Sequence, residues 1–68
     1  MNRIPVVSEN LNAVGYDSNS QILRIWFNNG TYDYFGVPEH IFNGLMNAPS
    51  KGRYHHQYIK DRYRFTKV

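Results

Sequence analysis

The chain has 68 residues and no cysteine, which predicts a single domain and excludes both a disulfide framework and a cysteine-based zinc site. No apolar run approaches the roughly 20 residues that span a bilayer, and the N-terminal residues lack the apolar centre of a signal peptide, so we expect a cytoplasmic protein with no membrane partner. The net charge is +3, and the basic residues concentrate after Asn47, where Asp61 is the one opposing acid. A basic C-terminal third favours an acidic partner, either nucleic acid or a phosphorylated small molecule.

The first half of the chain is expected to form strands. Residues 4–7 suit a short edge strand, because Pro5 cannot donate a hydrogen bond to a strand ladder. Residues 12–17 and 22–28 alternate between apolar and polar side chains, which is the period of a strand with one buried face. The polar residues 18–21 between them favour a four-residue turn.

A second hairpin is predicted at Asn29-Gly30, because a type I′ turn needs positive φ at both central residues. The predicted cross-strand neighbours in this hairpin are Asn28 with Thr31, Phe27 with Tyr32, Trp26 with Asp33, Ile25 with Tyr34, and Arg24 with Phe35. In the first hairpin they are Tyr16 with Leu23 and Val14 with Ile25. One face of this three-stranded meander then forms the core, with Val14, Tyr16, Leu23, Ile25, Phe27, Tyr32 and Tyr34.

Two helices are expected to cover that face. Pro38 suits the first helical position, the apolar residues within 41–46 recur at helical spacing, and Pro49 ends the run. Ser50 can cap a second helix that runs to about Tyr63. The sequence therefore predicts one α+β domain over all 68 residues, with the order β-β-β-α-α and an extra N-terminal strand as an option.

Several motifs carry a family resemblance. "AVGYD" at 13–17, the pattern L-x-I-x-F-x-x-G-x-Y-x-Y-x-x-VP at 23–38, "SKGRY" at 50–54 and "IKDRY" at 59–63 together resemble the KTSC domain. The resemblance implies a small stand-alone protein of prokaryotes or phages, from a family named for the C-terminus of some lysyl-tRNA synthetases. RNA binding has been suggested for this family through its association with the synthetase. Trp26 and the pair His55-His56 depart from the family pattern and are candidate points of individual function.

The outer face of the sheet, which is the face turned away from the helices, is the first candidate site. Arg24, Trp26 and Phe35 are predicted to lie there, beside the small residues Ala13 and Gly15. Exposed rings next to a cation form a stacking platform for bases. The alternative is that the N-terminal segment or a partner subunit covers this apolar face.

The second predicted helix is the other candidate. Arg53, Lys60 and Arg64 would line one side of it and contact phosphates, while Lys51 would lie near its first turn. The alternative is a solvated, charged helix face without a ligand.

The remaining polar and aromatic residues favour structural roles. Tyr32 and Tyr34 are expected to fill the core, with a hydroxyl group at its rim. His55 is expected at the packed side of its helix, and adjacent histidines cannot both face one metal site, so no metal is predicted. No nucleophile has a base at a recognisable spacing, and we therefore predict neither catalysis nor a cofactor.

The leading hypothesis is a non-catalytic module that binds RNA or single-stranded nucleic acid. Its predicted contacts are Arg24, Trp26, Phe35, Lys51, Arg53, Lys60 and Arg64. The alternatives are a homo-oligomer that sequesters a nucleotide-derived small molecule at a subunit interface, and a protein-protein interaction module.

Overall fold

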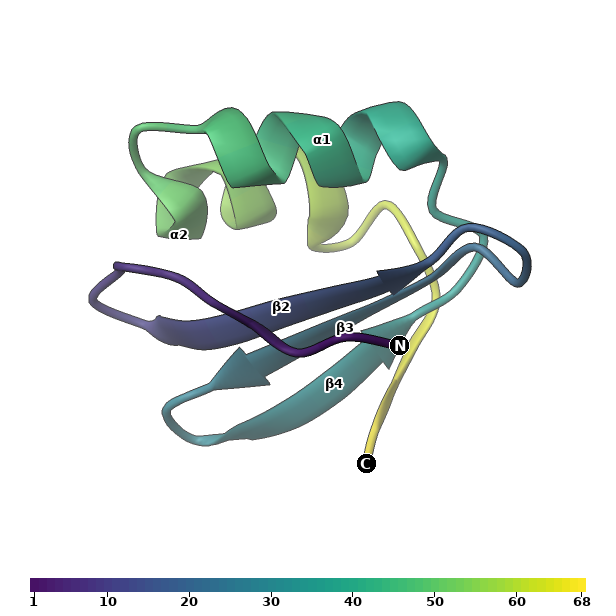
Figure 1. Ribbon diagram of the computed structural model, residues 1–68, viewed down its shortest axis with the longest axis horizontal. Coiled ribbons are helices and arrows are strands. Elements are labelled where there is room, and N and C mark those ends of the chain that lie inside the picture. Colours follow the sequence, from purple (N-terminus) through teal and green to yellow (C-terminus); the bar gives the residue numbers. More distant parts are fainter.

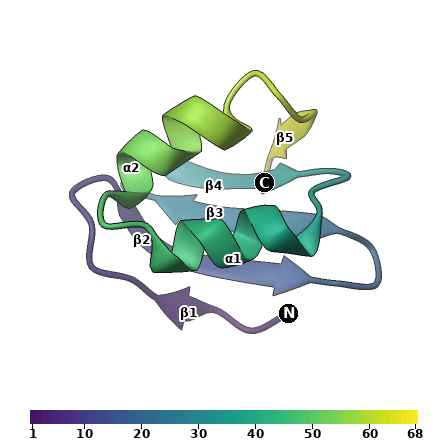
Figure 2. The ribbon, with the colours of Figure 1, turned by 90° about the horizontal axis from the view of Figure 1, so that it is seen from above.

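A computed structural model describes all 68 residues of the chain. Five antiparallel strands form one sheet, in which the spatial order of the strands is their order along the chain. The strands are β1 (Ile4–Pro5), β2 (Leu11–Asp17), β3 (Ile22–Phe27), β4 (Gly30–Tyr34) and β5 (Phe65–Lys67). The helical segments are α1 (Glu39–Asn47), α2 (Lys51–Tyr54) and the π-helical turn η1 (His55–Ile59). All three lie across the same face of the sheet (Figures 1 and 2).

The core lies between that face and the helices. The alternating residues of β2 and β3 provide the fully buried Val14, Leu23 and Ile25, while Leu45 from α1 and Ile59 from η1 close the core from above. The alternation along the strands therefore identifies the buried face correctly, as the period of two predicts. None of the helices is long and apolar enough to cross a membrane.

The first hairpin has the predicted register. Tyr16 lies opposite Leu23 and Val14 lies opposite Ile25, across the four-residue turn at 18–21. The N-terminal edge strand β1 is also present, with Pro5 opposite Ala13. Edge placement suits Pro5, because a proline nitrogen has no hydrogen to donate to a second neighbour.

The predicted register of the second hairpin is wrong by two positions. The two residues between the paired strands are Asn28 and Asn29, and Phe27 lies opposite Gly30. The Asn28 backbone N–H donates to the Asn10 carbonyl at 3.0 Å, and its side-chain amide donates to the Glu9 carbonyl at 2.7 Å. Asn28 is therefore tied to the β2 side of the sheet. It cannot pair with Thr31 as predicted.

This shift leaves every side chain on its predicted face, because two positions make one full strand period. It does change the cross-strand neighbours: Asp33 lies opposite Arg24 instead of Trp26, and Tyr34 lies opposite Leu23.

The C-terminal part of the chain corrects the prediction of three strands and a long second helix. The second helix ends at Ile59, because Lys60 is extended at ψ 132° and Asp61 has the positive φ of 63°. The Lys60 N–H donates to the His55 carbonyl at 2.8 Å, which closes a wide, π-type last turn. The chain then returns to the sheet as β5, beside β4. Tyr63 and Arg64 are therefore not helical, although Ser50 caps the helix as expected.

Candidate nucleic-acid interface

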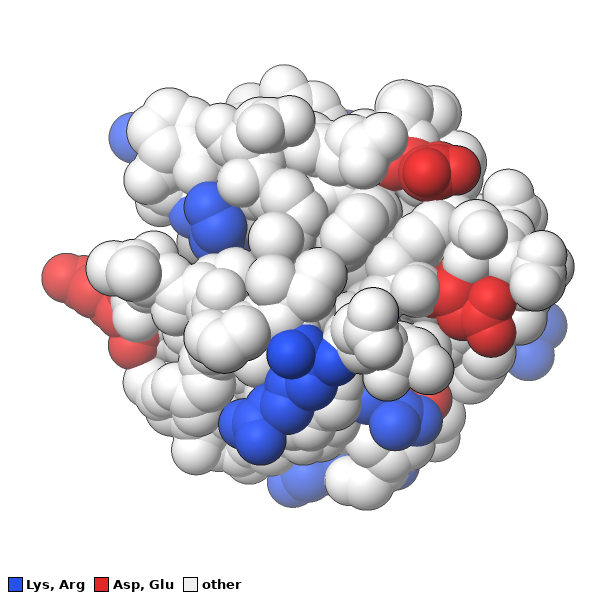
Figure 3. Space-filling model, viewed as in Figure 1, with Lys and Arg blue, Asp and Glu red and all other residues white.

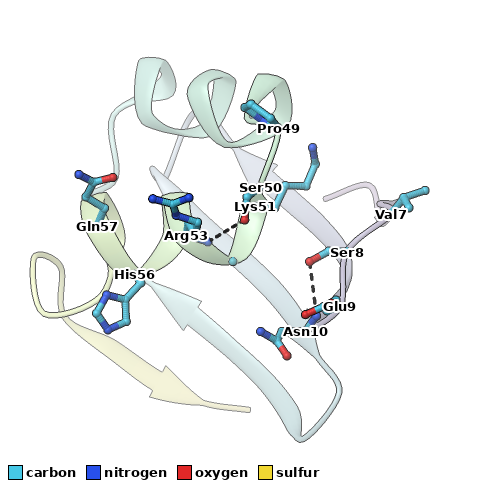
Figure 4. Close-up of a pocket in the computed structure, with 11 residues that line it drawn as sticks. Val7, Ser8, Glu9, Asn10, Pro49, Ser50, Lys51, Arg53, His56 and Gln57 are labelled. Atoms are coloured by element: carbon cyan, nitrogen blue, oxygen red, sulfur yellow. Dashed lines mark hydrogen bonds between the residues drawn. The ribbon is translucent and has the colours of Figure 1, made fainter.

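A polar groove of about 1000 Å³ runs between the loop after β1 and the start of α2. Val7 to Asn10 form one wall and Pro49 to Arg53 the other, with His56 and Gln57 at one end (Figure 4). Val7 is its one apolar lining residue, and Glu9 is its one acid. A groove this open and polar suits a charged chain better than a compact apolar ligand.

The two basic residues of this groove differ in their contacts. Lys51 Nζ donates to the carbonyl groups of Met46 and Ala48, at 3.2 and 3.1 Å, and so binds the otherwise free carbonyls at the end of α1. Arg53 is exposed, and its guanidinium makes no hydrogen bond or ion pair within the chain. Of the two, Arg53 is the side chain that is available to a phosphate.

The structure brings together part of the predicted basic helix face. Arg53, His56 and Lys60 are all exposed, and His56 lines the polar groove and also the two smaller depressions that Lys60 lines. These three residues therefore border one continuous hollowed surface. Arg64 does not line any of these depressions: it follows the turn after η1 and lines another one, which shares Asp61 and Phe65 with one of the two smaller depressions.

On the outer face of the sheet, Arg24 is paired within the chain. Its Nε and Nη2 donate to the two carboxylate oxygens of Asp33, at 2.6 and 2.9 Å. The carboxylate is almost fully buried, and a bidentate pair of this kind holds the guanidinium in place. Arg24 therefore adds little free positive charge to the outer face.

The N-terminal residues lie over the same face. The backbone of Asn2 and the side chain of Met1 contact Gly15 so closely that an added Cβ would lie 2.7 Å from the Asn2 carbonyl oxygen. The Arg3 guanidinium lies over the Trp26 ring, 5.2 Å from its centroid, and that of Arg24 lies at 5.9 Å. The small residue Gly15 thus makes room for the chain's own N-terminus beside Trp26.

Phe35 remains exposed, with 38% of its surface accessible. Lys and Arg atoms gather over the strand side of the molecule in the view of Figure 3, whereas acidic atoms lie toward its two ends. The central ring of the outer face, Trp26, is already flanked by two guanidinium groups of the chain.

A second depression, the aromatic hollow, opens between the β3–β4 hairpin, β5 and η1, with a volume of about 450 Å³. Its aromatic lining consists of Phe27, Tyr32, Tyr34, His55 and Phe65. Its polar lining includes Asn10, Asn29, His56, Lys60 and Asp61. Asn10, Gly52 and His56 also line the polar groove, so the two depressions adjoin.

Tyr34 and His55 form the buried side of the hollow. The Tyr34 hydroxyl and His55 Nε2 are 2.8 Å apart, and burial raises the pKa of Tyr34 to about 12. Burial also lowers the pKa of His55 to about 4, with smaller effects from Lys60 and His56. The imidazole is therefore neutral at pH 7, and we assign the hydroxyl as the donor and Nε2 as the acceptor.

The placement of Tyr34 and His55 agrees with the expected core and rim roles. What the sequence reasoning missed is that Tyr32, Tyr34 and His55 also border an open depression together with Phe65. The strand β5 supplies that fourth ring, and no pattern in its three residues predicted it. No three His, Asp or Glu side chains converge as metal ligands.

The fold and these depressions define a small α+β domain with an antiparallel sheet covered on one face by two helices. The KTSC domain family matches residues 7–63, and the chain belongs to that family. The crystal structure of a KTSC domain protein from Yersinia pestis is 40% identical and has a TM-score of 0.96, with 98% of this chain and 96% of that one covered.

Relatives of two sizes match the chain. A small protein of Tsukamurella paurometabola is 43% identical over 61 residues, which are 88% of this chain and 91% of that protein. A lysine–tRNA ligase of Trichormus variabilis is 41% identical over 54 residues, or 78% of this chain. The chain spans about a tenth of the length of that ligase. The domain thus occurs both as nearly a whole small protein and as a minor part of a large enzyme.

Proposed function

We propose that this KTSC domain is a non-catalytic module that binds single-stranded RNA along the surface bordered by Arg53, His56 and Lys60. The observation that carries the proposal is the continuity of the polar groove with the aromatic hollow, with unpaired cations beside both. The match to part of a lysine–tRNA ligase supports an RNA partner, since that enzyme acts on an RNA.

The charges support a polyanionic partner. The one ion pair within the chain is Arg24 with Asp33, so seven of the eight Lys and Arg residues have no acidic partner. Unpaired, exposed cations bind phosphates in a way that is independent of sequence and sensitive to salt.

The shape of this surface favours single-stranded RNA over a duplex. Arg53 lies in the short helix α2 and Lys60 follows η1, so these two cations do not line one long helix of the kind that enters a major groove. A groove next to exposed rings is the usual arrangement in proteins that bind single strands.

The test is a titration of the protein with a mixed-sequence ten-nucleotide RNA, followed by fluorescence anisotropy at several salt concentrations. We expect the affinity to fall steeply with salt. In the double variant Arg53→Ala/Lys60→Ala, the loss of two phosphate contacts should reduce the slope of log K against log salt by about 1.4, at about 0.7 per contact for a single strand. If neither RNA nor DNA of any sequence shifts the protein's NMR signals at low salt, the proposal fails.

The double variant Arg3→Ala/Arg64→Ala is the matched control, because it also removes two positive charges, from residues that border neither the polar groove nor the aromatic hollow. We expect a smaller loss of affinity and a smaller change in slope than in Arg53→Ala/Lys60→Ala.

Trp26→Ala tests the outer face separately. Because Arg3 and Arg24 already flank the indole, we expect RNA affinity within about 2-fold of the unmodified protein. A loss comparable to the 1–3 kcal/mol of a stacked base would place the strand on the outer face instead.

A further inference from the structure

We propose that the aromatic hollow binds one nucleobase, with the attached 5′-phosphate held by Lys60 or Arg53 at the adjoining polar groove. The ligand chemistry is that of a nucleoside monophosphate unit, either one unstacked residue of a bound strand or a free nucleotide. If the ligand is one nucleotide of a bound strand, the inference rests on the proposed RNA binding. If the ligand is a free nucleotide, the inference does not depend on RNA binding.

The rings of the hollow leave an aromatic surface open. Phe27 meets Tyr32 edge to face, with centroids 5.6 Å apart, and meets His55 in the same way at 4.9 Å. Phe65 is tilted by 60° against Tyr32 at 5.9 Å, so neither of these two rings is stacked on the other. Phe65 is also 56% exposed, although it lies in a strand. An exposed ring at the wall of a depression offers its face to a planar ligand.

The edge of the hollow supplies polar groups of both kinds. Asn10 and Asn29 each bring an exposed amide, which can donate and accept, and Asp61 brings an acceptor. A base presents donors and acceptors along its own edge, so it can bond to these groups while its faces contact the rings. The volume of about 450 Å³ lies within the range of small-molecule sites.

The chemistry around the hollow also excludes some ligands. Burial, with smaller effects from Lys60 and His56, lowers the pKa of His55 to about 4, so the imidazole in the aromatic wall is uncharged at pH 7. The cations are at the edge: Lys60 lines the hollow, Lys67 Nζ lies 5.9 Å from the centroid of the Tyr32 ring, and Arg53 lies in the adjoining groove. An uncharged, ring-lined interior with cations outside it fits a base with a phosphate, and fits an inorganic anion alone poorly.

The experiment has two arms, read by chemical shifts of the ¹⁵N-labelled full chain. One arm adds AMP, GMP, CMP or UMP alone, and the other adds the ten-nucleotide RNA. We expect shifts at the aromatic hollow in the RNA arm. Shifts there with a mononucleotide would identify a free nucleotide as a sufficient ligand.

The decisive variant is Phe65→Ala, which removes an exposed ring and so leaves the core intact. We expect RNA affinity to fall at least about 5-fold, the lower bound for loss of one stacked base. Phe65→Trp should restore it, because the ring face returns. Phe35→Ala is the matched control: it removes the same ring from a position that borders neither depression, and should change affinity less than 2-fold.

Each outcome separates this inference from the proposed function. If RNA binds but Phe65→Ala binds equally well and the hollow shows no shifts, the base site is wrong and RNA binding stands. If RNA does not bind but a mononucleotide shifts the hollow, RNA binding is wrong and the base site stands with a free nucleotide. If neither ligand produces shifts, both are wrong.

Discussion

His55 and Tyr34 are the two ionisable side chains with the large pKa shifts, to about 4 and about 12. The His55 ring contacts Phe27 and Tyr34 edge to face, and its Nε2 lies within hydrogen-bond distance of the Tyr34 hydroxyl. An imidazolium could not accept that hydrogen bond. Proton uptake by His55 therefore requires the hydrogen bond that joins η1 to β4 to reverse its direction, with Nε2–H as the donor and the Tyr34 hydroxyl oxygen as the acceptor.

We expect the free energy of unfolding to fall as the pH falls from about 6.5 to about 4, because burial lowers the pKa of His55 from 6.5 to about 4 in the folded state. In this interval the unfolded chain binds a proton that the folded chain does not. The full contribution is present above pH 6.5 and should not exceed about 3 kcal/mol. Urea unfolding at a series of pH values measures it.

His55→Gln should remove this part of the pH dependence, whereas His40→Gln should retain it because His40 is exposed. Equal pH profiles for the His55→Gln variant and the unmodified protein would show that the imidazole titrates normally in the fold.

At the scale of elements, the contact between α1 and α2 depends on a glycine. A methyl group at Gly44, in the middle of α1, would lie 2.7 Å from Cζ of Tyr54 in α2. Alanine is otherwise the better helix former by about 1 kcal/mol. The steric conflict should outweigh that preference.

We therefore expect Gly44→Ala to lower the free energy of unfolding by about 1–3 kcal/mol, the usual cost of overpacking. Gly52→Ala is the control, since a methyl group there would meet Asn10 Nδ2 at an ordinary 3.5 Å. Thermal and urea unfolding of both variants provide the comparison. A Gly44→Ala protein as stable as Gly52→Ala would mean that the two helices can move apart freely.

The elements also show what the sequence could and could not predict. The alternation of apolar and polar side chains in residues 12–17 and 22–28 identifies the buried face of the sheet, because the two-residue period of a strand depends only on the local sequence. The register of the second hairpin depends instead on Asn28, whose backbone and side chain bond to residues of the preceding loop. Sequence reasoning treated that hairpin as isolated and therefore placed its turn one residue too late.

The prediction for the C-terminal region was wrong for a related reason. The spacing of Tyr54, Tyr58 and Ile59 continues a helical pattern toward Tyr63, so the pattern alone extends the helix. The positive φ of Asp61 ends it, and β5 gains its hydrogen bonds from the free edge of β4. For the candidate site, the consequence is that Arg53 and Lys60 border one surface as predicted, whereas Arg64 does not join them and Phe65 was not among the predicted site residues.

At the scale of the whole molecule, stability concentrates in the middle of the sheet. The fully buried residues Val14, Leu23 and Ile25 belong to β2 and β3, whereas β1 has two exposed residues and β5 three. A chain of this size buries only about 60% of its unfolded surface, so its edges have little additional support.

We expect amide hydrogen exchange to be slowest in β2 and β3, near the limit set by global unfolding, and at least about 10-fold faster in β5. NMR-detected exchange of the free chain measures this. Bound RNA should slow exchange in β5 if Phe65 stacks on a base. Exchange in β5 as slow as in β3, without a ligand, would contradict this ranking.

The sheet order has a consequence for modular use of the domain. Because β1 and β5 occupy opposite edges of the sheet, the chain enters the fold at one edge and leaves it at the other. Phe65 and the aromatic hollow belong to the exit edge. Residues 1–3 lie over the outer face beside Gly15 and Trp26, so a larger protein joined ahead of residue 1 would attach at that face and not at the hollow. This placement is compatible with the two sizes of relative, in which the matching region is either nearly a whole small protein or about a tenth of a ligase.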